Sequence, residues 1–185
     1  PADFALDACR ATMAEVRRAT QEGPMFAVLD RLPMAEISRD EAIQLSWLLS
    51  SLLSRPVAQK LNGQMFFDVR DTGAKLKPGS GIRPTVTNVD LRFHNDNSYN
   101  ESPPDYVCLL CLHPAKKGGV SQVMSVATVH QALQERFPEL MDRLYRPFWY
   151  DRHAEHAPDE PTTFAAPIFE RAADALEERV LRGVG

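Results

Sequence analysis

The chain has 185 residues, of which 44% are hydrophobic and 25% charged, a balance that is typical of one folded domain and excludes a mostly disordered chain. Its 21 basic and 25 acidic residues give a net charge of −4, so there is no basic excess for binding nucleic acid or an anionic membrane. The apolar stretch 106–112 is far too short to span a bilayer, and no signal peptide is evident. Because the three cysteines are an odd number and suggest no disulfide framework, we expect a cytoplasmic protein.

Helices are predicted at both ends of the chain. The first covers 2–20, with Asp3 as its cap and an apolar stripe along one face. The second begins at Ser38, which forms a capping-box pattern with Glu41, and ends near Leu53. Later helices are predicted over 125–137, 139–145 and 171–181.

Strands are predicted mainly in the middle of the chain. Residues 85–96 alternate between apolar and polar side chains, the pattern of a half-buried strand. The continuous apolar run 106–112 predicts a central strand. Further strands are predicted at 25–29, 65–70, 120–124, 147–152 and 162–169. This order of elements predicts an α+β domain built on an antiparallel sheet or barrel.

The tripeptide His94-Asn95-Asp96 is the leading candidate for a site. On a strand, residues i and i+2 point to the same face, so His94 and Asp96 can reach one cation. Two histidines and one carboxylate form the facial triad of non-haem Fe(II) oxygenases. The alternative is a solvated strand face with a His–Asp hydrogen bond, and spacing alone does not separate the two.

Two other patterns are interpreted as structural. Cys108 and Cys111 have zinc or redox spacing, but there is no second cysteine pair and a strand would place them on opposite faces, so we expect two buried core residues. His153 and His156 lie in a polar, proline-bounded loop, which favours a solvated loop over a metal site. The sequence has no Ser/His/Asp nucleophile motif, phosphate-binding loop or dinucleotide fingerprint.

Six segments occur in a fixed order: FDVRDTG at 67–73, FHNDNSY at 93–99, PPDYV at 103–107, LLCL at 109–112, GGVS at 118–121 and LYRPF at 144–148. Together they resemble the taurine dioxygenase/clavaminate synthase family of Fe(II)- and 2-oxoglutarate-dependent oxygenases. The resemblance covers about 25–170. It implies a single oxygenase-like domain over 1–185, with a double-stranded β-helix (jelly-roll) core and flanking helices.

The resemblance also implies roles for individual residues. His94 and Asp96 correspond to two iron ligands, and Ser121 takes the place of the hydroxyl residue that contacts the carboxylate of 2-oxoglutarate. The implied reactants are 2-oxoglutarate, dioxygen and a small-molecule substrate. Polar residues around the pair are expected either to line the substrate mouth or to form ordinary surface: Asn88, Asp90, Arg92 and Asn97.

The family's distal His ligand and the Arg that follows it are not found. After Glu170 the chain passes directly into the predicted helix that begins at Arg171, so late barrel strands are missing before that residue. Either residues are absent from the sequence there, or the chain is a truncated homologue. The remaining histidines stand in no matching context: His113, His130, His153 and His156.

The sequence therefore predicts a 2-oxoglutarate-dependent oxygenase that hydroxylates a small, amino-acid-like substrate. The missing distal ligand supports the alternative, a non-catalytic degenerate barrel that acts as a binding or scaffold domain. A cupin-like metal enzyme of other chemistry would need a further His/Glu cluster, which the sequence does not show.

Overall fold

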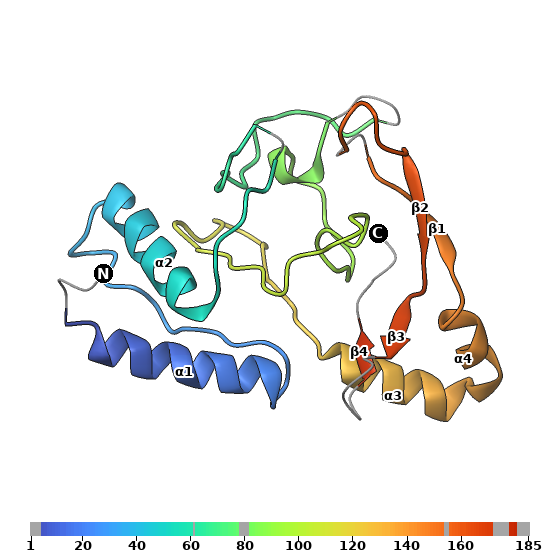
Figure 1. Cartoon of the computed structure of the whole chain (residues 1–185). Helices are drawn as coiled ribbons and strands as arrows, with labels where there is room; N and C mark the ends of the chain where they lie inside the picture. Colours follow the sequence, from blue (N-terminus) through green and yellow to red (C-terminus); the bar gives the residue numbers. More distant parts are fainter. Residues whose placement is uncertain (1–4, 61, 78–81, 154–155, 172–177, 181–185) are drawn as a thin grey trace.

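The computed structural model describes residues 5–60, 62–77, 82–153, 156–171 and 178–180 (Figure 1). Helices α1 and α2 lie side by side at one end, and the later helices and the strands lie at the other (Figure 1). The described residues between Ser54 and Ser125 join them; they are mostly irregular and contain one short 3₁₀ helix. The elements are α1 (Asp7–Gln21), α2 (Arg39–Leu53), η1 (Pro84–Val86), α3 (Val126–Arg136), α4 (Pro138–Leu144), β1 (Phe148–Asp151), β2 (Thr163–Ala166), β3 (Phe169–Arg171) and β4 (Glu178–Val180).

Helices α1 and α2 form the first small core. The capping box of α2 is present, because the Ser38 hydroxyl accepts from the Glu41 backbone N–H while the Glu41 carboxylate accepts from the Ser38 N–H. The guanidinium of Arg17 in α1 donates to the backbone carbonyl of Leu53, which satisfies a free carbonyl at the end of α2. Met13 and Leu53 are buried where the helices meet.

The second core lies where α3, α4 and the strands pack together. Strands β1 and β2 pair antiparallel, with Tyr150 opposite Phe164 and their rings stacked 5.3 Å apart. The side chains of His130, Met141 and Phe169 are buried in this part of the chain, and the rings of His130 and Phe169 meet at 4.8 Å. Strands β3 and β4 form a second antiparallel pair. The predicted helices 125–137 and 139–145 and strands 147–152 and 162–169 are thus confirmed within a few residues.

Five predicted strands are wrong. Residues 25–29, 65–70, 106–112 and 120–124 are irregular, and so is 85–96 apart from η1 at its start. A strand needs a neighbour to satisfy its backbone groups, and these segments find almost none among the described residues. Two backbone hydrogen bonds join two of these segments near their ends. The Arg70 N–H donates to the Thr85 carbonyl and the Thr72 N–H to the Val86 carbonyl, both at 3.0 Å.

The missing strands also overturn two burial predictions. Without a partner sheet, Val89, Leu91 and Phe93 are exposed, although the alternation predicted a buried face. Cys108 and Cys111 are exposed as well, so the prediction of two buried core residues is wrong.

The predicted C-terminal helix is also wrong where the structure describes it. Arg171 belongs to β3 and residues 178–180 form β4. Residues 172–177 and 181 lie outside the described residues, as does the predicted cap Asp3.

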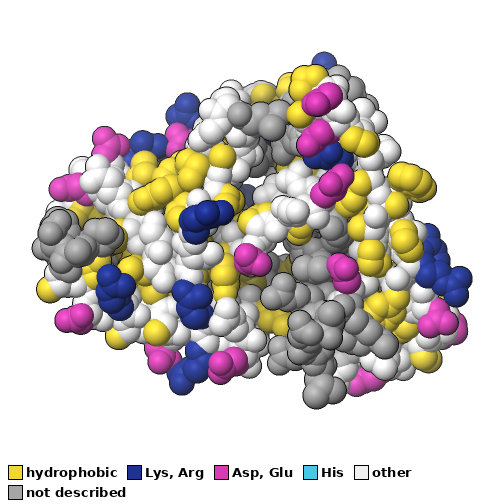
Figure 2. All heavy atoms as spheres, in the orientation of Figure 1, with side chains coloured by type: hydrophobic (Ala, Val, Ile, Leu, Met, Phe, Trp, Pro, Cys, Tyr) yellow, Lys and Arg dark blue, Asp and Glu magenta, His cyan; other side chains and the backbone are white. Residues whose placement is uncertain are grey.

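The accessible surface shows how open the chain is. It amounts to 14443 Å², whereas a compact monomer of this mass exposes about 8,900 Å². Hydrophobic side chains are accordingly scattered over the visible face (Figure 2). The described strands form two two-stranded antiparallel sheets, which is less than a complete double-stranded β-helix. None of the helices in the described part of the chain is long and apolar enough to cross a membrane.

Candidate active site

The structure brings His94 and Asp96 together. They lie just before and at the start of the turn 96–99, and the His94 Nε2 atom is 3.3 Å from the Asp96 Oδ1 atom. The side chains are 38% and 47% exposed, so a small ligand can reach both. Although the segment is irregular rather than a strand, both side chains face the same point.

A hydrogen bond fixes which nitrogen of His94 is available. The Nδ1 atom lies 2.7 Å from the backbone carbonyl oxygen of Arg92. Because a carbonyl oxygen only accepts, Nδ1 carries a hydrogen, so a neutral ring in this orientation has its lone pair on Nε2. Metal-binding histidines are usually oriented in this way, with the second ring nitrogen donating to a carbonyl or carboxylate.

The spacing of the two acceptor atoms fits a shared cation. A lone pair on His94 Nε2 facing a carboxylate oxygen of Asp96 is repulsive unless a proton or a metal ion lies between them. Two ligands bound about 2.1 Å from one ion at a right angle would stand about 3.0 Å apart, close to the observed separation. The nitrogen and oxygen donors are also those that Fe(II) accepts in facial-triad sites.

Asn97 shapes the turn that follows. Its φ of +57° is left-handed, a conformation in which Asn is enriched. The Asn97 carbonyl accepts from the Asn100 N–H at 3.0 Å, and its side-chain oxygen accepts from the Tyr99 hydroxyl at 3.1 Å. Ser98, between them, is buried. Asn97 therefore has a structural role in this turn.

The other predicted site residues are not assembled around the pair. Asn88, Asp90, Arg92 and Ser121 are all exposed on the irregular segment. Arg92 contacts His94 through its carbonyl oxygen, whereas Ser121 makes no hydrogen bond to the pair in the described part of the chain. Within the same residues, no third His, Cys, Asp or Glu completes a metal-binding group.

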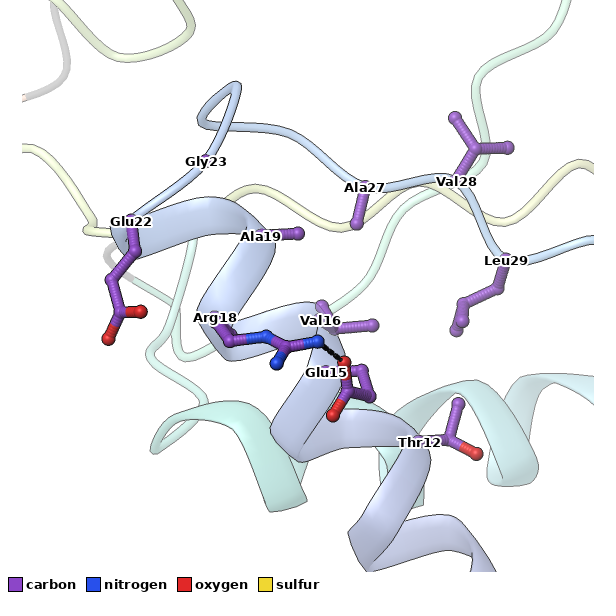
Figure 3. A pocket seen from close by; sticks show the side chains of 10 residues that line it. All are labelled: Thr12, Glu15, Val16, Arg18, Ala19, Glu22, Gly23, Ala27, Val28 and Leu29. Carbon is purple, nitrogen blue, oxygen red and sulfur yellow. Dashed lines mark hydrogen bonds and ion pairs between the residues drawn. The ribbon is translucent and has the colours of Figure 1, made fainter.

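An open groove lies elsewhere, between α1 and the segment that follows it (Figure 3). Apolar atoms of Val16, Ala27 and Leu29 line it, and the ion pair between Glu15 and Arg18 lies along the helix (Figure 3). It contains none of the predicted site residues and lacks an assembled set of reactive side chains.

Comparison with known proteins identifies the family. Residues 2–184 match the family described as "Taurine catabolism dioxygenase TauD, TfdA family". The chain belongs to this family. Its members have a jelly-roll fold and depend on Fe(II) and 2-oxoglutarate, so the resemblance drawn from the motifs is confirmed.

Comparison with one curated relative shows how much of its length this chain covers. The chain is 30% identical over 149 residues to the "FR-33289 synthase" of Streptomyces rubellomurinus (strain ATCC 31215). That match covers 80% of this chain and 42% of the relative. The chain thus spans less than half the length of the curated relative it matches. No solved structure matches the chain significantly.

Proposed function

We propose that the protein is an Fe(II)- and 2-oxoglutarate-dependent oxygenase that hydroxylates a small, amino-acid-like substrate, with His94 and Asp96 as two of its iron ligands. The main observation in support of this proposal is the close contact between His94 and Asp96. His94 Nε2 lies 3.3 Å from Asp96 Oδ1, and the contact of Nδ1 with the Arg92 carbonyl orients the ring so that Nε2 faces Asp96. Family membership supports the same chemistry.

Each residue of the pair has a distinct task in this proposal. Asp96 contributes a negative charge that offsets part of the charge of the ion, and His94 contributes a neutral nitrogen ligand. The Arg92 carbonyl keeps the His94 ring oriented. Iron held by these residues would supply the redox chemistry by which 2-oxoglutarate is decarboxylated and one oxygen atom of dioxygen enters the substrate.

Ser121 is proposed to donate a hydrogen bond to the 2-oxoglutarate carboxylate. Its exposed hydroxyl can donate to an anion without adding charge. Asn88, Asp90 and Arg92 are proposed to face the substrate from the exposed segment before the pair, and Asn97 to do so from the turn whose shape it also determines.

We propose that residues 1–185 form one oxygenase-like domain. The distal His and Arg then come from residues that this sequence lacks before Arg171. The acidic composition and the odd cysteine count support a cytoplasmic protein without a nucleic-acid or membrane partner.

Fe(II) binding by the full-length protein tests whether His94 is an iron ligand. Titration with Fe(II) under anaerobic conditions should show one site per chain, and His94→Ala should abolish or greatly weaken it. His113→Ala is the matched control, because His113 is exposed and outside the pair. Equal binding by wild type and His94→Ala would contradict the proposal.

A non-catalytic degenerate barrel is the second candidate, favoured by the absence of a third ligand among the described residues. A protein of that kind would bind no Fe(II) at His94 and Asp96, and would produce no succinate from 2-oxoglutarate. The same titration therefore separates the two candidates.

A further inference from the structure

The turn that begins at Asp96 is held from the end of β1. Arg152 directly follows β1, and its side chain is only 10% exposed. Its Nη1 atom lies 3.9 Å from Glu101 Oε1, five residues beyond Asp96, and its Nη2 atom lies 2.9 Å from Glu160 Oε2. One buried guanidinium thus lies between Glu101, two residues beyond the turn 96–99, and Glu160 in the loop between β1 and β2.

A second contact joins the same two segments. The ring of His153 meets the ring of Tyr99 edge to face at 5.1 Å. On the turn itself, the Tyr99 hydroxyl donates to the Asn97 side chain, while the Arg83 guanidinium lies 5.7 Å from the Tyr99 ring centre. Aromatic contacts of this kind favour one orientation of the rings. The turn is therefore attached to β1 through two successive residues.

These contacts are important because pairing between strands does not hold the turn. Residues 87–96 are irregular, so no sheet fixes where His94 and Asp96 lie. Arginine remains charged at any ordinary pH, and a buried guanidinium therefore needs carboxylate partners nearby. The Nε atom of Arg152 is buried without a hydrogen-bond partner, which leaves the two glutamates as its main polar anchors besides the Pro161 carbonyl.

We propose that Arg152 is a positioning residue for the metal site, which acts through Glu101 on the turn that carries Asp96. This inference rests on the proposed function, since it concerns the same metal-binding pair. Arg152 touches neither His94 nor Asp96 and is not itself a ligand. No local sequence pattern indicates that residues 101 and 152 meet, so this role of Arg152 could not be predicted from the sequence.

Co(II) binding to the complete polypeptide tests the proposal without relying on activity. Arg152→Met and Glu101→Gln should each weaken Co(II) binding about tenfold, the lower end of the effect of losing an outer contact to a metal site. Because both changes break the same ion pair, the double variant should weaken Co(II) binding by less than the product of the two single effects. Arg152→Lys should recover part of the affinity.

Glu160→Gln is the matched control. It removes the nearer carboxylate from Arg152 but leaves the turn unaltered, so Co(II) affinity should stay within about twofold while the melting temperature falls. If Glu160→Gln weakens Co(II) binding as much as Glu101→Gln does, Arg152 acts only through general stability and the inference is wrong. Glu101 is 60% exposed, so its variant remains informative even where Arg152→Met fails to fold.

The outcome of the Asp96→Ala variant separates the two proposals. Loss of Co(II) binding in Asp96→Ala together with wild-type affinity in Arg152→Met and Glu101→Gln would overturn the positioning role alone. Failure of the wild type to bind Co(II), or full binding by Asp96→Ala, would overturn the proposed function and this inference with it.

Discussion

At the scale of single residues, the most informative feature is the contact between His94 and Asp96. The sequence predicted their proximity from strand geometry, and the structure reaches it through the bend before the turn at Asp96. The hydrogen bond from His94 to the Arg92 carbonyl could not be predicted, because it depends on how the backbone folds back by two residues. The metal-binding role of the pair stays a prediction.

Ser121→Ala should weaken 2-oxoglutarate binding. Loss of one hydrogen bond to a charged group costs about 1.5–3 kcal/mol, so the dissociation constant of 2-oxoglutarate should rise about tenfold or more while Fe(II) binding is unchanged. Ser125→Ala is a suitable control, because the Ser125 side chain does not cap α3. Unchanged 2-oxoglutarate affinity in Ser121→Ala would remove Ser121 from the site.

The cysteines give a prediction opposite to the one made from sequence. Since Cys108 and Cys111 are exposed, a thiol reagent should modify both in the native 185-residue chain about as fast as in urea. Cys9, which is half-buried in α1, should react more slowly. Mass spectrometry of partly labelled protein assigns the sites. Strong protection of both Cys108 and Cys111 would contradict the exposed conformation of 106–112.

At the scale of elements, local patterns predicted four of the helices, whereas the C-terminal helix and the strands that need a distant partner were predicted wrongly. Helix α2 was predictable because Ser38 and Glu41 satisfy its first N–H groups within four residues. The hairpin β1–β2 was predictable because its two strands are close in sequence. The run 106–112 and the alternating segment 85–96 have strand-like patterns, but a strand forms only with a partner, and the sequence does not say which segment pairs with it.

The capping box should make the stability of α2 depend on pH. Hydrogen bonds from the Ser38 backbone N–H and then from its hydroxyl lower the pKa of Glu41 below its ordinary value of 4.5. A carboxyl whose pKa is depressed on folding adds stability above the unfolded value, and this stability is lost as the pH falls through the folded pKa. Wild type should therefore exceed Glu41→Gln in unfolding free energy at pH 7.

Urea unfolding of both proteins across the acid range measures the difference between their unfolding free energies. This gap between wild type and Glu41→Gln should shrink once the pH drops below 4.5. Ser38→Ala should reduce the gap only in part, because its backbone N–H still donates to Glu41. A gap that widens toward acid pH would show that the sign of this effect is wrong.

At the scale of the whole molecule, the two small cores leave much apolar surface between them. Large apolar side chains are exposed along the connecting segment: Val57, Phe66, Phe67, Val69, Leu76, Val89, Leu91, Phe93, Val107, Leu109, Val120, Val123 and Met124. In a jelly roll, strands of this kind are covered by the opposite sheet. The chain matches only 42% of its relative, so much of that protein has no counterpart here.

The exposed surface predicts strong binding of the dye ANS by the 185-residue chain. ANS fluorescence rises where apolar surface is accessible, so the native chain should give a large increase that is lost in concentrated urea. Replacing Leu109, which is 81% exposed, by Ser should lower the signal with little effect on unfolding. Absence of ANS binding would indicate that these side chains are covered in solution.

The most direct test of the central claim is conversion of 2-oxoglutarate to succinate by the complete polypeptide with Fe(II) in air. We expect succinate formation by the wild type, increased by small amino-acid-like substrates, and its loss in Asp96→Ala, which removes the anionic member of the pair. Asp30→Ala, which alters a carboxylate that is 91% exposed and outside the pair, should retain activity. Succinate formation by Asp96→Ala at the wild-type rate, or none by iron-loaded wild type with any such substrate, would contradict the proposed oxygenase function.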